Sequence, residues 1–348
     1  MKKSALFCSH GLGDGLLFLT LANNLKQNGF AVTAYHDFLG EIQDCLEVLV
    51  QKFPPEEELA GLISSLDLIV INGDSSPRSQ KLAALAKTLK PASSWVLHAT
   101  TCKGKVAELP GDYYLDSRRS LVDNLLVFSR EVLGLKKVVR DNCLRLPKEK
   151  LLPEALKEAA VKVKKNFFKQ PLAALHAVSK DAEKNWPLKK FLCLAQKLEQ
   201  RGYAVAFLFS REERTKWAGP IEKAGFFVPA LASLREMVFF LHQAAFFIGN
   251  DSGLGHLAAA LKVPVLSIFS TRRKEKFWRP ERQIGRSVVP FLLLPNCKGF
   301  RLQEKFWKFL LPVFKVLSSF RLLEKSVFPE AALKKRLLWL KALRVFHE

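Results

Sequence analysis

The chain has 348 residues, which is longer than one typical domain and predicts two. Hydrophobic residues make up 49% of it and charged residues 25%, a balance that is typical of globular proteins and excludes an intrinsically disordered chain. The sequence has no uncharged apolar stretch of about 18 residues, the length of a membrane-spanning helix. Its six cysteines are scattered without a C-x-x-C pair, which argues against zinc or a disulfide framework and favours a reducing cytosol.

The net charge of +22 is concentrated in the second part of the chain. Residues 1–145 carry 17 lysines and arginines against 16 aspartates and glutamates, whereas residues 146–348 carry 38 against 17. This asymmetry indicates an acidic partner, which is either nucleic acid, an anionic lipid or a phosphorylated substrate. Nucleic acid is the least favoured of the three, because the sequence shows no basic recognition helix, zinc finger or aromatic RNA-binding motif.

The N-terminal part alternates predicted strands and helices. Its first residues resemble a signal peptide, but His10 and Asp14 interrupt the apolar run and no small-residue cleavage site follows. We therefore expect a folded domain to begin here, with a strand over 4–9, a tight glycine loop over 11–15 and a helix over 16–27. Further strands are expected over 30–35, 68–72 and 94–98, with helices between them, and a helix over 120–133.

A lysine-rich segment over 147–165 predicts a linker with a surface helix, after which the alternation restarts. The later strands are expected over 172–178, 204–209, 226–228, 244–248 and 263–269, and the helices over 187–201, 212–224, 233–243 and 257–261. This order predicts two α/β domains, each with a parallel sheet and crossover helices. Ligands of such sheets bind beyond the carboxyl ends of the strands, so we expect a cleft between the domains.

The segment from Phe247 to Leu257 is the most informative motif of the chain. It joins a predicted buried strand to a helix through an acid, a hydroxyl, two glycines and a histidine. Glycines let the backbone approach a phosphate closely, and a helix start offers unpaired N–H groups and the positive end of the dipole. The pattern therefore predicts a phosphate site, and a plain helix cap by Asp251 or Ser252 is the alternative.

A second glycine-rich segment runs from Ser9 to Gly15. Gly11 and Gly13 fit the start of a dinucleotide fingerprint, but Leu16 stands where its third glycine belongs, which disfavours a nicotinamide cofactor. A carboxylate in a glycine loop at the edge of a cleft suits a general base, so Asp14 is the candidate catalytic residue. Its alternative role is that of a helix cap.

Two further segments follow predicted strands. Ser179, Lys180 and Lys184 in the loop after residue 178 have the chemistry to hold a diphosphate, with a solvated loop as the alternative. Glu212 or Glu213 after the next strand could accept hydrogen bonds from ribose hydroxyls, although a charged helix start explains them as well.

Metal chemistry is not indicated by the sequence. It contains no pair of aspartates two residues apart, the usual carboxylate clamp for a metal-bound diphosphate. We therefore expect no metal, although Asp181 and Glu183 have the chemistry of a cation site. No organic cofactor is expected either.

These segments together resemble glycosyltransferase family 9, the heptosyltransferases of lipopolysaccharide core assembly. The resemblance rests on His176-Ala177, Lys184-x-Trp186-Pro187, Asn250 to Ala260, Pro264 to Phe269 and Trp278-x-Pro280, with Gly13-Asp14 similar to the N-terminal motif of the family. It covers about residues 4–290 and is most specific over 176–280. It implies a GT-B fold, in which two Rossmann-like domains face each other across a cleft.

The resemblance also implies an activity, namely inverting transfer of a sugar from a nucleotide donor, typically ADP-heptose, to a lipid-linked acceptor. By this resemblance Asp14 is the base that takes the proton of the acceptor hydroxyl. The implied donor-binding residues are Ser179, Lys180, Lys184, Glu212, Glu213, Asp251, Ser252, Gly253 and His256, and the acceptor-side loop holds His10, Gly11 and Gly13. A GT-B protein that binds a nucleotide sugar without transferring it is the alternative, and Asp14 distinguishes the two.

Three departures from the family leave the nucleotide and the sugar open. Val178-Ser179 stands where the family often has two threonines, so one hydroxyl is missing. The loop before Lys184 is a residue longer, and residues 270–276 are more basic than the usual turn with glycine and proline.

The expected domains are an acceptor-binding domain over 1–145, a linker and surface helix over 146–168, a nucleotide-sugar domain over 169–290 and a basic helical extension over 291–348. The extension carries 12 lysines and arginines against 4 acidic residues, interleaved with bulky apolar side chains. This pattern predicts a cytoplasmic protein bound peripherally to the anionic inner-membrane surface, and packing of the extension against the domains is the alternative.

Overall fold

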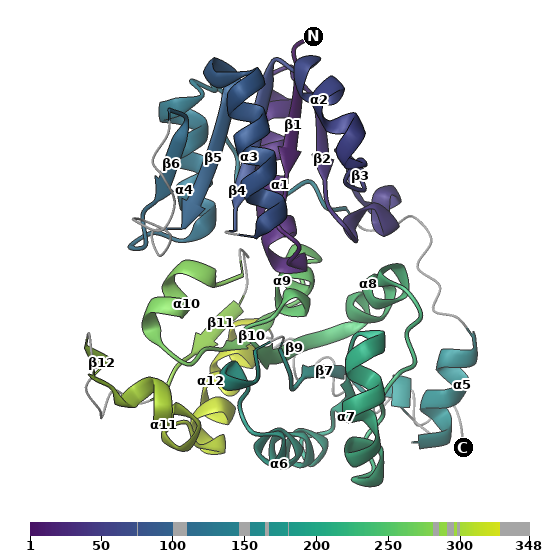
Figure 1. Cartoon of the computed structure of the whole chain (residues 1–348). Coiled ribbons are helices and arrows are strands. Elements are labelled where there is room, and N and C mark those ends of the chain that lie inside the picture. Colours follow the sequence, from purple (N-terminus) through teal and green to yellow (C-terminus); the bar gives the residue numbers. More distant parts are fainter. Residues whose placement is uncertain are drawn as a thin grey trace.

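The protein is described by a computed structural model that covers residues 1–74, 76–99, 110–145, 154–163, 167–179, 181–280, 285–290, 296–297 and 300–327. Two α/β domains lie one above the other in Figure 1, each built on a parallel sheet. The predicted GT-B class with a helical C-terminal segment is confirmed. Among the helices in the described ranges, none is long and apolar enough to cross a membrane. Cys8, Cys45, Cys143 and Cys193 are free thiols.

The first domain contains a six-stranded parallel sheet in the order β3-β2-β1-β4-β5-β6. Its strands are β1 Lys3–Phe7, β2 Ala31–Tyr35, β3 Leu49–Gln51, β4 Leu68–Gly73, β5 Ser94–Ala99 and β6 Asp112–Leu115. Because side chains alternate along a strand, Leu6 packs with helices α1 (Leu12–Gln27) and α4 (Leu121–Val127). Ala5 and Phe7 instead join the core beneath α2 (Glu56–Ser64) and α3 (Pro77–Leu89). The sheet is thus covered on both faces.

The boundaries of two helices in this domain differ from the prediction. Helix α1 begins at Leu12 instead of residue 16, because Gly11 has extended backbone angles and the N–H of Gly15 already donates to the Gly11 carbonyl at 2.9 Å. The expected glycine loop is therefore mostly the first turn of a helix. The helix expected over 120–133 divides into α4 and a π-helical turn, Phe128–Val132. It ends before Gly134, whose φ of +64° suits glycine.

The second domain contains a five-stranded parallel sheet in the order β11-β10-β9-β7-β8. Its strands are β7 Leu172–His176, β8 Ala204–Phe207, β9 Ala244–Asn250, β10 Val265–Ile268 and β11 Gly285–Val288. Its helices are α6 Leu188–Glu199, α7 Arg211–Lys223, α8 Leu234–His242, α9 Gly253–Ala260 and α10 Arg272–Trp278, and α5 (Glu154–Val163) precedes them.

Two expectations for this sheet were wrong. The strand expected over 226–228 is reduced to an isolated bridge between Ala206 and Phe227. Conversely, the sheet does not end with the strand expected over 263–269, because β11 pairs with β10 beyond it. Helix α9 also begins four residues before the predicted start, at Gly253.

Two helices follow the second sheet, α11 (Leu302–Leu310) and α12 (Val313–Val327). Trp307, Val316, Phe320 and Leu323 are fully buried in the core beneath this sheet. The ring of Phe320 meets that of Phe246 on β9 edge to face, 5.0 Å between centroids. Part of the basic C-terminal segment therefore packs back onto the domain, whereas residues 328–348 of the predicted extension lie outside the described ranges.

The two domains meet where α1 lies against α9 (Figure 1). One hydrophobic core continues from Leu16 and Leu17 of α1 to Leu257 and Ala258 of α9. These helices directly follow β1 and β9, so the contact brings the carboxyl ends of both sheets together. The site predicted from the sequence must lie at this junction.

Candidate functional site

Two glycines allow the starts of α1 and α9 to approach each other closely. A Cβ atom on Gly13 would lie 2.5 Å from Cδ2 of His256, and one on Gly253 would lie 3.0 Å from Cβ of Leu12. A larger residue at position 13 would require His256 or the helices to shift, and one at position 253 would require Leu12 to give by a few tenths of an ångström. The structure thus brings the Asp14 segment and the Asp251–His256 motif, which are far apart in the sequence, into one place.

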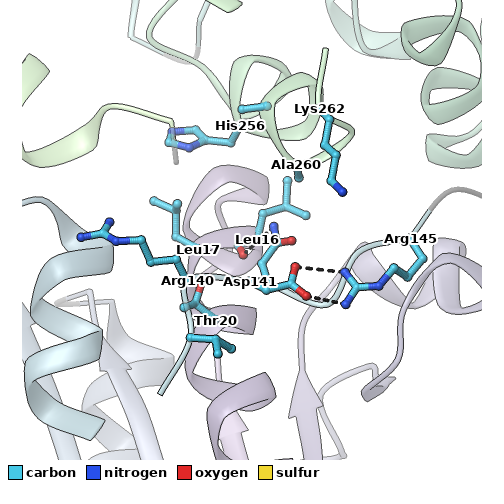
Figure 2. Close-up of a pocket in the computed structure, with 12 residues that line it drawn as sticks. Leu16, Leu17, Thr20, Arg140, Asp141, Arg145, His256, Ala260 and Lys262 are labelled. Carbon is cyan, nitrogen blue, oxygen red and sulfur yellow. Dashed lines mark hydrogen bonds and ion pairs between the residues drawn. The ribbon is translucent and has the colours of Figure 1, made fainter. Parts of the chain in front are cut away.

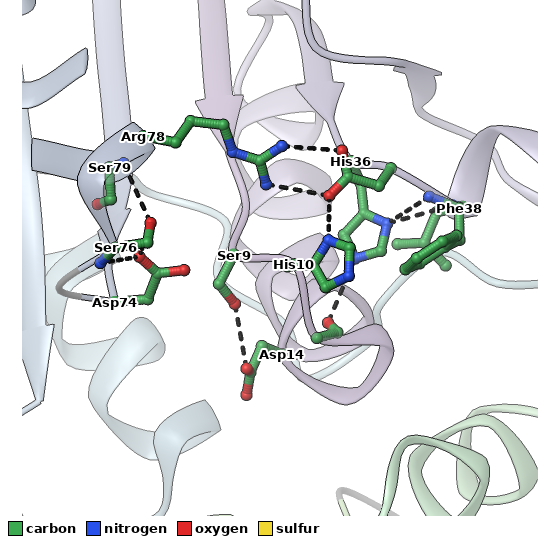
Figure 3. A network of polar contacts seen from close by, with 12 residues as sticks. Ser9, His10, Asp14, His36, Phe38, Asp74, Ser76, Arg78 and Ser79 are labelled. Atoms are coloured by element: carbon green, nitrogen blue, oxygen red, sulfur yellow. Dashed lines mark hydrogen bonds and ion pairs between the residues drawn. The ribbon is translucent and has the colours of Figure 1, made fainter. Parts of the chain in front are cut away.

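The carboxylate of Asp14 is held by a short chain of hydrogen bonds. Ser9 Oγ donates to Asp14 Oδ2 at 3.1 Å, and Asn72 Nδ2 at the end of β4 donates to Ser9 Oγ at 3.1 Å. Gly11 makes room for the carboxylate, since a Cβ there would lie 2.6 Å from Oδ2. Asp14 is half-buried in the first turn of α1 and is not the N-cap, which is Gly11 (Figure 3). These hydrogen bonds fix the orientation of the carboxylate at the start of α1.

His10 lies in a charged cluster beside this turn (Figure 3). Its Nδ1 is 2.6 Å from Asp37 Oδ2, and Arg78 donates to both oxygens of Asp37 at 2.9 and 3.0 Å. The Arg78 hydrogen bond, aided by His10 and opposed by partial burial, lowers the pKa of Asp37 to about 2. Asp37 is thereby engaged by side chains of its own domain, whereas in a dinucleotide fold the corresponding acid binds ribose.

Ser252 occupies the N-cap position of α9 without capping it. Its backbone is extended as in an N-cap, but its side chain makes no hydrogen bond to the N–H groups of the first turn. Of these groups, the Gly255 N–H donates to the Ser252 carbonyl at 3.1 Å, whereas those of Gly253 and Leu254 precede any acceptor within the helix. They carry the positive end of the dipole. The plain capping role considered for Ser252 is therefore not realised, and the helix start is suited to an anion.

The hydroxyl of Ser252 is instead engaged by His176, which ends β7. Nδ1 of His176 lies 2.9 Å from Ser252 Oγ, and its Nε2 lies 3.3 Å from Glu213 Oε2. Burial would raise the pKa of Glu213, but hydrogen bonds from His176 and from the Ser210 N–H lower it to about 2. Glu213 also completes a capping box with Ser210. Of the two acids predicted to bind ribose, Glu213 is thus already hydrogen-bonded to His176 and Ser210, whereas Glu212 is exposed.

The lysine loop, residues 179–184 after β7, is held by hydrogen bonds from its own residues and from α11. Ser179 Oγ lies 2.8 Å from Asn185 Oδ1, and Trp307 of α11 donates through Nε1 to the Glu183 carbonyl at 3.0 Å. Asp181 accepts from the Glu183 N–H at 3.0 Å and so caps a short 3₁₀ turn. Within the described part of the chain, no three histidines, cysteines or acids gather as a metal site. Lys180 and the side chain of Lys184 lie outside the described residues.

Asn250 is a positioning residue to which the sequence analysis assigned no role. Its Oδ1 accepts from the Trp186 N–H at 3.0 Å and its Nδ2 donates to the Ala177 carbonyl at 2.7 Å. This buried side chain ties the end of β9 to both ends of the lysine loop. The sequence signal for Asn250 was its place in the motif, and the same holds for His176. Asn72 lies on β4, far from Asp14 in the sequence, and no pattern indicated that it supports Asp14.

His256 is buried between the two domains. Burial lowers the pKa of its imidazole to about 4, so the ring is neutral near pH 7. It borders an interdomain cavity of about 700 Å³. Figure 2 shows Leu17 and Thr20 of α1 on one side of this cavity and Ala260 and Lys262 on the other. The cavity is lined from Leu16 onward on α1 and from His256 onward on α9, so neither Asp14 nor Gly253 lines it.

Comparisons with known proteins agree with this geometry. A family model described as glycosyltransferase family 9 (heptosyltransferase) matches residues 123–295. Lipopolysaccharide heptosyltransferase 1 of Pseudomonas aeruginosa is 39% identical over 90 residues, which are 25% of this chain and 25% of that protein. Lipopolysaccharide heptosyltransferase 3 of Escherichia coli is 35% identical over 111 residues, 28% of this chain and 30% of that protein. The matched segments thus span less than a third of these curated relatives.

Solved structures resemble nearly the whole chain. Escherichia coli ADP-heptose lipopolysaccharide heptosyltransferase II has a TM-score of 0.63 and 17% identity, over 93% of this chain and 98% of that chain. Escherichia coli heptosyltransferase WaaC with ADP has a TM-score of 0.62 and 14% identity, over 92% and 99%. At these identities the likeness establishes the fold.

Proposed function

Since the chain belongs to glycosyltransferase family 9, we propose that it is an inverting glycosyltransferase that moves a sugar from a nucleoside diphosphate to a lipopolysaccharide-core-type lipid acceptor. The observation that supports the proposal is the close approach of the starts of α1 and α9, because the first turn of α1 carries the Asp14 carboxylate and the start of α9 offers N–H groups to an anion. Heptose from ADP-heptose is the donor sugar proposed first, since one structural neighbour is an ADP-heptose enzyme and another is solved with ADP.

The proposed reaction is a single displacement. Asp14 takes the proton of an acceptor hydroxyl, and the oxygen of that hydroxyl attacks the anomeric carbon from the face opposite the diphosphate. The new C–O bond forms as the bond to the diphosphate breaks, which inverts the anomeric centre. The leaving diphosphate gains negative charge, which the N–H groups at the start of α9 and the charge of Lys184 stabilise. Glu212 is proposed to accept hydrogen bonds from the ribose.

Donor binding is tested by calorimetric titration with ADP, UDP, GDP, CMP and NADH, without added metal. We expect selective binding of ADP, followed by transfer when ADP-heptose and a lipid acceptor are supplied. Preference for UDP or GDP would leave the proposed glycosyltransferase activity standing but would contradict ADP-heptose as the donor. Binding of none of the five would overturn the nucleotide site at α9.

We also propose that α11 and α12 hold the protein on an anionic membrane. Phe309 is 80% exposed and Phe314 is 64% exposed, although both follow the well-buried Trp307 closely in sequence. Exposed cations on α12, Arg321 and Lys325, accompany them. Aromatic side chains beside basic ones are typical of surfaces that enter the headgroup region of anionic bilayers. A membrane position would bring the enzyme to a lipid-linked acceptor.

Removal of these phenylalanines is expected to abolish vesicle binding. We expect flotation of the wild type with phosphatidylglycerol vesicles at low salt, and loss of flotation in the double variant Phe309→Ser, Phe314→Ser. Leu89→Ser is the matched control, because Leu89 is an exposed apolar residue of the first domain, 39% accessible. Equal flotation of the double variant and the control, or none by the wild type, would contradict the membrane role.

A further inference from the structure

Three polar side chains from different elements form one hydrogen-bonded chain at the start of α9. His176 is in the middle, with Ser252 Oγ 2.9 Å from one ring nitrogen and Glu213 Oε2 3.3 Å from the other. The side chain of His176 is 3% exposed, so water does not replace these partners. We propose that protonation of His176 is coupled to binding of the donor diphosphate, because it decides whether Ser252 donates a hydrogen bond to that ligand. This inference rests on the proposed function, which places the diphosphate at this helix start.

The neutral imidazole leaves Ser252 poorly suited to an anion. The carboxylate of Glu213 can only accept, because its pKa of about 2 keeps it ionised near pH 7. Nε2 of His176 must then carry the single ring hydrogen, and Nδ1 has a lone pair. The Ser252 hydroxyl therefore donates to Nδ1. Its single hydrogen is then not available to a phosphate oxygen, which has only the N–H groups of α9 as donors at this point.

The protonated imidazole reverses the direction of one hydrogen bond. Both ring nitrogens of His176 then donate, Nε2 to Glu213 and Nδ1 to Ser252 Oγ. The hydroxyl hydrogen of Ser252 is released and can turn toward a phosphate oxygen beside the N–H groups of α9. The anion and the proton thus favour each other, and each must strengthen the binding of the other by the same factor.

The charged neighbour of His176 among the described residues is Glu213 of α7, 3.3 Å away, and Asp251 lies one residue before its other partner, Ser252. His256 on α9 adds no opposing charge near pH 7, since burial lowers its pKa to about 4. The Phe209 ring, 6.0 Å away between centroids, shields the site.

The coupling is tested with ADP-glucose as the probe, titrated calorimetrically from about pH 6 to 8.5 in buffers of different ionisation enthalpy. Its phosphates are diesters and lack the second titration that a monoester has near pH 6. We expect the affinity to rise as the pH falls, by up to about tenfold per pH unit, with uptake of up to one proton per ligand. A hydrogen bond of purely structural role would not move protons.

Three variants separate the coupling from simple loss of binding. Ser252→Ala should bind more weakly at low pH and with little pH dependence, whereas Ser252→Thr keeps the hydroxyl and should restore it. Ser64→Ala is the matched control, since its hydroxyl donates to the Ala60 carbonyl within α2, away from the donor site, so the pH dependence should remain. Binding of ADP-glucose with equal affinity at all pH values, or full pH dependence in Ser252→Ala, would overturn the coupling alone. Absence of binding at every pH would overturn the donor site as well.

Discussion

Replacement of Asp14 by asparagine is expected to slow sugar transfer by about 10²- to 10⁴-fold without weakening the binding of ADP. Asparagine keeps the size of the side chain and can still accept the Ser9 hydrogen bond, 3.1 Å in the native protein. It cannot take the proton of the acceptor hydroxyl. Single-turnover transfer and calorimetric titration with ADP measure the two effects separately.

Asp67→Asn is the matched control for this experiment. Asp67 directly precedes β4, at the amino ends of the strands and so away from the site. Its carboxylate accepts a hydrogen bond from the Lys3 N–H at 2.7 Å. The control should transfer sugar at the native rate. Undiminished transfer by Asp14→Asn would remove Asp14 from the mechanism, and joint loss of transfer and ADP binding would assign it a structural role.

The substitution Gly13→Ala is expected to disrupt the junction of the two domains. Its new methyl group would lie 2.5 Å from Cδ2 of His256, well inside van der Waals contact. The imidazole is buried, so either the ring shifts toward the interdomain cavity or α1 and α9 separate. Such overpacking costs about 1–3 kcal/mol. We expect a lower urea midpoint together with a large loss of transfer, because Asp14 and Ser252 lie on the separated helix starts.

Gly61→Ala tests whether this loss is specific to the junction. Gly61 is also helical, in α2, and a Cβ there meets nothing within 4 Å. Alanine should stabilise that helix by about 0.5–1 kcal/mol and leave transfer unchanged. Equal stability and activity of Gly13→Ala and the wild type would show that the close approach of α1 and α9 is not required.

Local patterns predicted most of the fold because they report local physics. Apolar runs bounded by turn residues identified strands such as β1, β4, β7 and β9, and their alternation with helices predicted two parallel sheets. The helix starts at Leu12 and Gly253 were placed too late, because glycine has low helix propensity and reads as a loop. Tertiary contact between α1 and α9 overrides that preference. The short strand β11 was missed because pairing with β10, and not its own sequence, makes it a strand.

The sequence by itself determined the chemistry of the site. Asp14, the Asp251–His256 motif and the lysine loop were recognisable, because each combines reactive side chains with glycines or a helix start over a few neighbouring residues. Only the tertiary structure decided which of these groups act together. In the folded protein Glu213 is hydrogen-bonded to His176, and Asn72 donates to Ser9. Ser252 contacts His176 and does not cap α9. The partners of each such bond lie on different strands or helices, and their distance is set by packing of whole elements, which no local pattern records.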